Sequence, residues 1–241
     1  MEGLILIEQD EHRQLSLQQT QRGRLVVFDF DGTSISANSP VKLVKYLTIK
    51  GMLGPTYVAR IIAWAVAYAL HIPQNEAWVR GLVFSAFEGW KKEKADAFLR
   101  DFYDEEIEPL FRPVADQTMM AHMAKGDTVV VISATFEPII LRAMEKHAFK
   151  NQVSVCMVVD QKGCYTRQVD GTPVEGEEKV RCVERFGNQM FGEGNWDLVC
   201  AYADHYSDIP LLEMAQHPIA VSPGPALARE AKKRGWEILD W

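Results

Sequence analysis

Two aspartates, Asp29 and Asp31, stand two residues apart immediately after a short apolar run. Side chains at positions i and i+2 of an extended segment point to the same side, so these carboxylates are expected to lie close together. Like charges this close are costly unless a cation joins them or one group keeps its proton. Both outcomes are useful, because a magnesium-bound carboxylate could attack a substrate while its protonated neighbour serves as general acid.

The same two residues also fit a calcium-binding loop or an ordinary polar turn. A calcium loop continues with further oxygen ligands at fixed intervals. No such series follows Asp31, which makes calcium the weaker interpretation. If the pair is catalytic, other elements of the fold must bring further groups to it.

Apolar runs alternate with helical patterns along most of the chain. The predicted strands are 25–28, 128–132, 153–159, 198–202, 219–221 and 236–239, and the predicted helices between them are 138–147, 177–186, 209–216 and 226–234. Continuously apolar strands are typical of parallel sheets covered on both faces. The alternation predicts the α/β class with a doubly wound, Rossmann-like parallel sheet. Ligands of such sheets bind at the carboxyl ends of the strands, where three of these runs place Asp or Ser.

The alternation stops between residues 37 and 112, where no strand is predicted. Helical patterns cover 40–50, 56–71, 75–87 and 92–111, and Ser39 is the expected N-cap of the first of these helices. An all-helical insertion after the first strand predicts a cap domain over the strand ends. The expected division is a polar extension at 1–23, a core domain at 24–36 and 113–241, and a cap domain at 37–112.

One predicted cap helix, at 57–71, is apolar nearly all round. It is short for a bilayer span and Arg60 interrupts it, so burial within the cap is the favoured interpretation. Contact with a membrane surface, or with an apolar substrate, is the alternative. Four aromatic residues would then line a pocket, although packing of the cap core explains each more simply: Trp64, Tyr68, Trp78 and Trp90.

The charge balance restricts the class of partner. The chain has 26 basic and 33 acidic residues and a net charge of -7. A nucleic-acid partner would require a basic face, so none is expected. An anionic substrate would require a local cation, either a metal ion or a well-placed lysine.

The cysteines and the N-terminus indicate a compartment. Cys156, Cys164, Cys182 and Cys200 lack the spacing of a zinc site and are expected to be free thiols, with Cys156 and Cys200 in buried strands. Acidic residues stand at the N-terminus where a signal peptide would be positively charged. Both features predict a cytoplasmic protein.

Four motifs in order resemble those of the haloacid dehalogenase superfamily of phosphatases. They are Phe28–Thr33 (FDFDGT), the strand end Val130–Ser133, the helix start Gly176–Val180 with its lysine, and Asp204–Asp208 with two acidic residues. The helical insertion is similar to that of subclass IB, the phosphoserine-phosphatase-like members with a helical cap. Each motif falls in the structural context that it requires, which lends weight to the resemblance.

The resemblance implies a role for each matching residue. Asp29 would attack phosphorus and form an aspartyl-phosphate, which water then hydrolyses. Asp31 would act as general acid and base, and its backbone carbonyl would bind Mg²⁺ together with Asp29 and Asp204. Asp208 would hold a metal-bound water or Lys179, and Lys179 would neutralise charge on the nucleophile and the phosphoryl group.

The phosphate oxygens would be held by Ser133 and by backbone groups of Ala134 and Gly32, together with Lys179. Taken one at a time, several of these residues have simpler interpretations. Ser133 and Asp208 could be helix N-caps, and Lys179 could be a solvated helix residue. His205, next to a metal ligand, could contact substrate or be an exposed loop histidine.

The sequence therefore predicts a Mg²⁺-dependent phosphomonoester hydrolase that acts on a small phosphorylated metabolite. Phosphoserine, a lipid-linked phosphate and transfer of phosphate to another hydroxyl are the alternatives. The substrate-reading glutamate of phosphoserine phosphatases would fall near Asn38, which is not acidic. A membrane surface is a less favoured partner, a scaffold domain without activity is the competing class, and the oligomeric state is left open.

Overall fold

The computed structural model describes residues 22–69 and 76–241. The predicted extension at 1–23 lies outside them except for its last two residues. The end of the predicted apolar helix, at 70–71, also lies outside, and so does the side chain of Tyr68.

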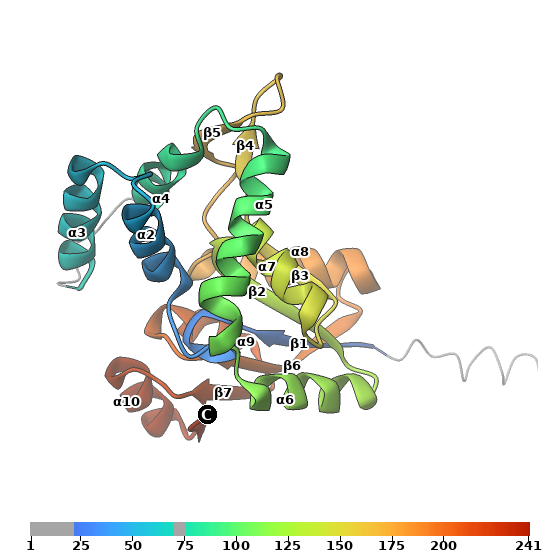
Figure 1. The fold of residues 1–241 in the computed structure, drawn as a ribbon. Helices are drawn as coiled ribbons and strands as arrows, with labels where there is room; N and C mark the ends of the chain where they lie inside the picture. Colours follow the sequence, from blue (N-terminus) through green and yellow to red (C-terminus); the bar gives the residue numbers. More distant parts are fainter. Residues whose placement is uncertain (1–21, 70–75) are drawn as a thin grey trace, which may run out of the picture.

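The core of the molecule is a six-stranded parallel sheet, which confirms the predicted α/β fold (Figure 1). Its strands, in spatial order, are β3 (Asn151–Val155), β2 (Thr128–Phe136), β1 (Gly23–Phe28), β6 (Trp196–Ala203), β7 (His217–Val221) and β8 (Glu237–Leu239). The side chains of Leu25 to Phe28 in the central strand β1 are fully buried. Burial on both faces explains why this segment is continuously apolar.

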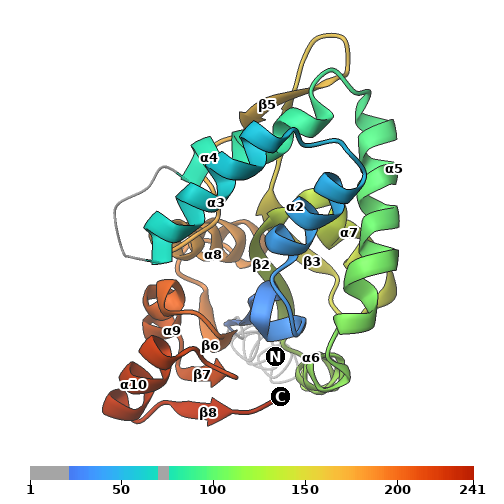
Figure 2. The ribbon, with the colours of Figure 1, turned by 60° about the vertical axis from the view of Figure 1, so that its left-hand side comes forward.

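Helices cover both faces of the sheet. In Figure 2, α6 (Pro113–Ala124) and α7 (Glu137–Lys146) lie on one side of the strands. On the other side are α8 (Glu177–Phe191), α9 (Ile209–Met214) and α10 (Pro225–Arg234). The strand order places β1 at the switch point, where the connections turn from one edge to the other. Binding sites in doubly wound sheets lie at such a point.

The prediction of one strand at 153–159 is wrong. β3 ends at Val155, and β4 (Met157–Val159) pairs antiparallel with β5 (Tyr165–Val169) in a separate two-stranded sheet. Cys156, between them, is half-buried and not the core residue expected. The second sheet has another partner, since the backbone N–H of Tyr165 donates to Trp90 at 2.9 Å. An apolar run carries no signal for which of two sheets its residues join.

The insertion between β1 and β2 is helical, as predicted. Its elements are α2 (Ser39–Ile49), α3 (Pro55–Ala69), α4 (Glu76–Phe84), the 3-10 turn Ser85–Phe87 (η2), α5 (Lys92–Phe102), the π-helical turn Tyr103–Ile107 (η3) and the 3-10 turn Glu108–Leu110 (η4). The two segments that connect it to the sheet run antiparallel, with a bridge between Ile35 and Phe111. This bridge lies where the chain leaves the sheet for the insertion and returns from it.

The cap helix α3 is not buried, which contradicts the favoured interpretation. All its side chains between Pro55 and Ala67 are exposed or partly exposed, and Ile62 and Val66 have exposed fractions of 57% and 56%. The helix stands at the outer edge of the insertion (Figure 1). It packs mainly against α4, and its residues Tyr57, Val58 and Ile61 are partly buried against the core cluster. None of the described helices is long and apolar enough to cross a bilayer.

The aromatic residues expected near this helix have different surroundings. Trp90 packs edge-on against Phe87 and Phe98 and is therefore part of the cap core. Trp78 is 48% exposed, and Trp64 is partly exposed.

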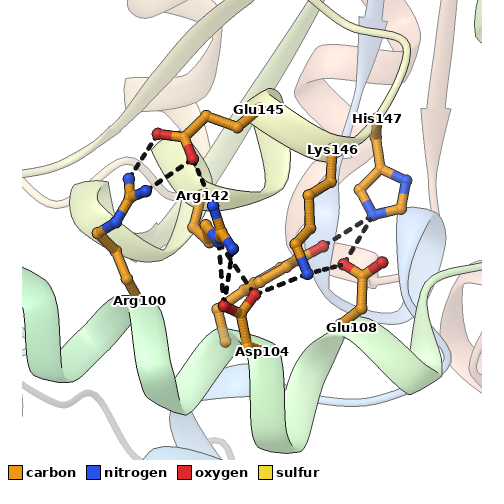
Figure 3. A network of polar contacts seen from close by, with 8 residues as sticks. Arg100, Asp104, Glu108, Arg142, Glu145, Lys146 and His147 are labelled. Atoms are coloured by element: carbon orange, nitrogen blue, oxygen red, sulfur yellow. Dashed lines mark hydrogen bonds and ion pairs between the residues drawn. The ribbon is translucent and has the colours of Figure 1, made fainter.

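An ion-pair network fixes the end of the insertion to the core (Figure 3). Arg142 on α7 donates to Asp104 in η3 at 2.8 Å and to Glu145 at 2.7 Å. His147, just after α7, lies 3.2 Å from Glu108 and stacks on Phe111. The network joins residues on both sides of the connection between insertion and sheet, so it restricts how that connection can move.

Candidate active site

The carboxyl ends of three adjacent strands bring the predicted site together. Phe28 at the end of β1 lies between Val131 of β2 and Tyr202 of β6. Asp29 follows Phe28 directly, and Ser133 and Asp204 lie two residues beyond Val131 and Tyr202, so the three reach the same edge of the sheet. The backbone N–H of Asp29 donates to the Tyr202 carbonyl at 2.9 Å, which fixes the start of the turn after β1.

Lys179 joins two of the predicted carboxylates. Its Nζ lies 2.8 Å from Oδ1 of Asp29 and 2.7 Å from Oδ1 of Asp208. All three side chains are at least nine-tenths buried. Burial raises the pKa of Asp29 to about 6, although the Lys179 ammonium opposes this shift. Burial alone would lower the pKa of Lys179, but the two carboxylates raise it above its ordinary value.

Neither Lys179 nor Asp208 fits the simpler interpretation given for it from the sequence. The lysine is not a solvated helix residue, because its side chain is 5% exposed. Asp208 precedes α9 at the N-cap position but makes no side-chain cap hydrogen bond. Its carboxylate faces Lys179.

Asp204 completes a group of three carboxylates. Asp29, Asp204 and Asp208 each offer an oxygen, and these oxygens lie within 4.8 Å of one another. Burial and the charges of Asp29 and Asp208 raise the pKa of Asp204 to about 8. Of the basic side chains in 22–69 and 76–241, only Lys179 forms an ion pair with any member of the group. Three carboxylates and one ammonium leave negative charge that a divalent cation would offset, so these residues fit Mg²⁺.

The carboxylate of Asp31 is not a member of this group and has hydrogen-bond partners of its own. Its Oδ1 accepts a hydrogen bond from the backbone N–H of Ser39, and its Oδ2 accepts one from the Thr135 hydroxyl at 2.6 Å. Burial outweighs these two bonds and raises the pKa of Asp31 to about 6. Its predicted part in metal binding concerns the backbone carbonyl and stays a prediction.

The contact from Ser39 corrects the expected cap of α2. The N-cap is Asn38, whose side chain accepts from Val41 N–H at 3.0 Å. Ser39 is the first residue of the helix, and its hydroxyl lies 2.8 Å from that of Thr135. Asparagine caps helices as well as serine does, so the sequence alone did not separate the two positions.

Gly32 lets the turn after β1 approach Asp204. Its φ angle is +73°, a conformation that glycine adopts without strain. A Cβ atom at this position would lie 2.1 Å from Oδ2 of Asp204. The Gly32 N–H donates to the Ala37 carbonyl at 2.9 Å. To contact phosphate as predicted, this N–H would have to share its hydrogen between the carbonyl and a phosphate oxygen.

Ser133 lies within β2 and is 1% exposed. It is not a helix cap, because the N-cap of α7 is Phe136. The Ser133 Oγ accepts a hydrogen bond from the Thr135 N–H at 3.1 Å. Its own hydroxyl proton is therefore directed elsewhere, and its contact with a phosphate oxygen stays a prediction. The carbonyl of Ala134 accepts from Arg80 of α4 at 2.8 Å.

Several contacts at this site were missed by sequence reasoning. Thr135 holds Asp31, and Ser34 donates its hydroxyl to the Asp29 carbonyl at 2.7 Å. Both residues lie one or two positions beyond a recognised motif, which is the only sequence signal for them. Arg80 is far away in sequence, and nothing in its helix marks it. His205 is partly buried, not exposed as one interpretation held, and its Nδ1 lies 2.9 Å from the Ser207 hydroxyl.

Comparisons with known proteins bear on this arrangement. A family model described as haloacid dehalogenase-like hydrolase matches residues 26–213. A histidinol-phosphatase of Neisseria meningitidis serogroup C (strain 8013) is 28% identical over 235 residues, which cover 90% of this chain and 98% of that protein.

Two solved structures share the fold. A protein of unknown function from Bordetella pertussis Tohama I has a TM-score of 0.81 at 25% identity, over 91% of this chain and 99% of that one. A phosphoserine phosphatase, solved as an analogue of its phospho-aspartyl intermediate, has a TM-score of 0.62 at 18% identity, over 91% and 93% of the two chains. The second likeness concerns the fold alone.

Proposed function

Because this chain belongs to the haloacid dehalogenase-like hydrolases and is a phosphatase of that family, we propose that it is a Mg²⁺-dependent phosphomonoester hydrolase in which Asp29 is the nucleophile. The substrate class is a small phosphorylated metabolite. The observation that carries the proposal is the buried contact of Lys179 with both Asp29 and Asp208, at 2.8 and 2.7 Å, beside the third carboxylate, Asp204.

The residues divide the chemistry between them. Asp29 attacks phosphorus while the ester bond to the leaving oxygen breaks, which gives an aspartyl-phosphate. Asp31 donates a proton to the leaving oxygen and then takes one from the water that hydrolyses the intermediate. Its pKa of about 6 suits both tasks near neutral pH. The Lys179 ammonium and the Ser133 hydroxyl offset the charge on the phosphoryl oxygens.

The metal would be held by Asp29, Asp204 and the Asp31 carbonyl, with Asp208 next to them. Mg²⁺ would supply charge neutralisation for the phosphoryl group and for the three carboxylates. The helices at 37–112 would form a cap over this edge, and the rest of the chain from residue 24 would form the core domain. The four free thiols support the predicted cytoplasmic location.

The direct test is phosphate release from a panel of esters in the presence of Mg²⁺. The panel contains sugar phosphates, phosphoserine, histidinol phosphate and phosphocholine, with the third included because a relative is named as a histidinol-phosphatase. We expect one or more small esters to be hydrolysed, and Asp29→Asn to abolish this. Asp170→Asn, an exposed carboxylate, is the matched control. If no ester were hydrolysed, or if Asp29→Asn kept full activity, the proposal would fail.

A lipid-linked phosphate is the second candidate, and the exposed apolar surface of α3 favours it. The discriminating measurement is sedimentation with vesicles that contain anionic lipid. If the lipid candidate holds, the protein sediments with the vesicles and Ile62→Ser with Val66→Ser releases it. Protein that stays in the supernatant and ignores phospholipid substrates would eliminate this candidate.

A further inference from the structure

Arg80 connects the helical insertion to the phosphate end of the site. It lies on α4, and its side chain is 12% exposed. One arm of the guanidinium, Nη1, donates to the Ala134 carbonyl at 2.8 Å. The other arm, Nη2, lies 3.3 Å from a carboxylate oxygen of Glu175. The insertion therefore contacts the core beside two of the sequence motifs.

The Ala134 carbonyl belongs to the same peptide unit as the Thr135 N–H, and that unit is planar. The carbonyl accepts from Arg80, while the N–H donates to the Ser133 Oγ at 3.1 Å. The two ends of one peptide unit are thus fixed by two different partners. Rotation of the unit would break both hydrogen bonds together.

This arrangement determines where the Ser133 hydroxyl can donate. Because Ser133 Oγ accepts from Thr135 N–H, its own proton is directed elsewhere. A charged donor on the carbonyl also polarises the peptide unit, which strengthens the N–H as a donor. Arg80 therefore stabilises the orientation in which Ser133 can donate to a phosphate oxygen.

The same arginine borders the segment that positions Lys179. Glu175 precedes Gly176 and α8, and its carbonyl accepts from Glu178 N–H at 3.0 Å in the first turn of that helix. Lys179 lies in the same turn. Arg80 thus contacts both the segment that carries Ser133 and the segment that precedes Lys179.

We propose that Arg80 is a positioning residue of the insertion, which holds the 134–135 peptide so that Ser133 donates its hydroxyl proton to the phosphoryl group of the substrate. The inference rests on the proposed function, since it assigns Ser133 to the phosphoryl group. If Arg80 has this role, the affinity for phosphate depends on how α4 packs against the core.

The test measures binding of inorganic phosphate by calorimetry in the presence of Mg²⁺. Arg80→Met should weaken phosphate binding roughly tenfold, as expected for the loss of one charged hydrogen bond. Mg²⁺ affinity should change less than about twofold, because no metal ligand is touched. Arg60→Met, an exposed arginine of the neighbouring helix α3, is the control and should bind phosphate as the wild type does.

A double-mutant cycle with Ser133→Ala separates positioning from a general structural role. If Arg80 acts through Ser133, Arg80→Met causes no further loss of phosphate affinity in the Ser133→Ala background. Equal, additive losses in both backgrounds would overturn the proposal, and so would wild-type phosphate affinity in folded Arg80→Met. If Arg80→Met does not fold, Arg80→Lys replaces it in the same cycle. This variant keeps the positive charge but lacks the two guanidinium nitrogens that bind Ala134 and Glu175, and the same outcomes support or overturn the proposal.

The role of Arg80 and the proposed function are contradicted by different results. A wild type that binds phosphate and hydrolyses esters, with an Arg80 variant that behaves like it, contradicts only the role of Arg80. A wild type that hydrolyses no ester contradicts the proposed function.

Discussion

Three carboxylates lie near one ammonium at this site: Asp29 and Asp208 contact Lys179 directly, and Asp204 lies beside them. Asp29 and Asp204 have pKa values raised to about 6 and about 8, chiefly because burial disfavours their charged forms. A folded protein that holds protons more tightly than the unfolded chain loses stability as pH rises. This contribution is largest below about pH 4 and falls as the pH rises to about 8. A divalent cation, which binds the charged forms, opposes the loss.

We therefore expect Mg²⁺ to raise the melting temperature more at pH 8 than at pH 5. With Mg²⁺ at about a hundred times its dissociation constant, the rise at pH 8 should be about 5–10 °C. Thermal unfolding with and without Mg²⁺ at the two pH values measures this. Asp204→Asn should remove most of the response. An equal shift at both pH values would contradict a site in which protons compete with the metal.

Gly32 offers a second test at the scale of a single residue. Gly32→Ala places a Cβ atom against Asp204 in a positive-φ conformation, so we expect at least a tenfold loss of Mg²⁺ affinity and of kcat/KM. Gly51→Ala is the matched control, with a φ of +70° and no atom within 4 Å of the added Cβ. It should cost about 1 kcal/mol of stability and leave Mg²⁺ binding unchanged. Equal Mg²⁺ affinities in the two variants would show that the approach of Asp204 does not matter.

At the scale of the elements, a buried polar network attaches α6 to the sheet. His122 of α6 lies 2.8 Å from both Asp127 and the Tyr202 hydroxyl of β6, and Arg24 of β1 donates to Asp127 at 2.6 Å. Burial by itself would raise the pKa of Asp127, but the hydrogen bonds from Arg24 and His122 lower it below its ordinary value. The charged carboxylate therefore contributes stability above about pH 4, which is lost as the pH falls further.

We expect Asp127→Asn to lower the free energy of unfolding by about 2 kcal/mol at pH 7 and by less at pH 3. Urea unfolding at the two pH values measures the difference. Asp197→Asn removes the partly exposed ion-pair partner of the exposed Arg22 and should cost less than about 1 kcal/mol. If Asp127→Asn lowered the free energy of unfolding equally at both pH values, the charge of Asp127 would not contribute to stability.

Elements could be predicted from the sequence where a local pattern determines them. The central strand and the glycine turn after it were predicted correctly because burial on both faces leaves a continuous apolar run. The break at Cys156 could not be predicted, since Val155, Cys156 and Met157 are all apolar, while β4 pairs with β5 beside the insertion. The helix α3 was expected to be buried on composition alone, and composition carries no information on whether a neighbour exists.

At the scale of the whole molecule, the order of the motifs predicted which residues meet. Parallel strands end at one edge, so Asp29, Ser133 and Asp204 had to lie near one another once the sheet was recognised. The contacts from the insertion followed no such rule. Ser39 and Arg80 reach Asp31 and Ala134 from two different helices, and their positions depend on how the insertion packs on the core.

The central claim is that Asp29 becomes covalently phosphorylated. The most direct measurement is to quench the reaction during turnover, reduce it with borohydride and map the peptides by mass spectrometry. An acyl-phosphate on Asp29 is reduced to homoserine, so we expect homoserine at position 29 and aspartate at position 31. An unmodified Asp29 in an enzyme quenched during turnover, or homoserine at another aspartate, would contradict it.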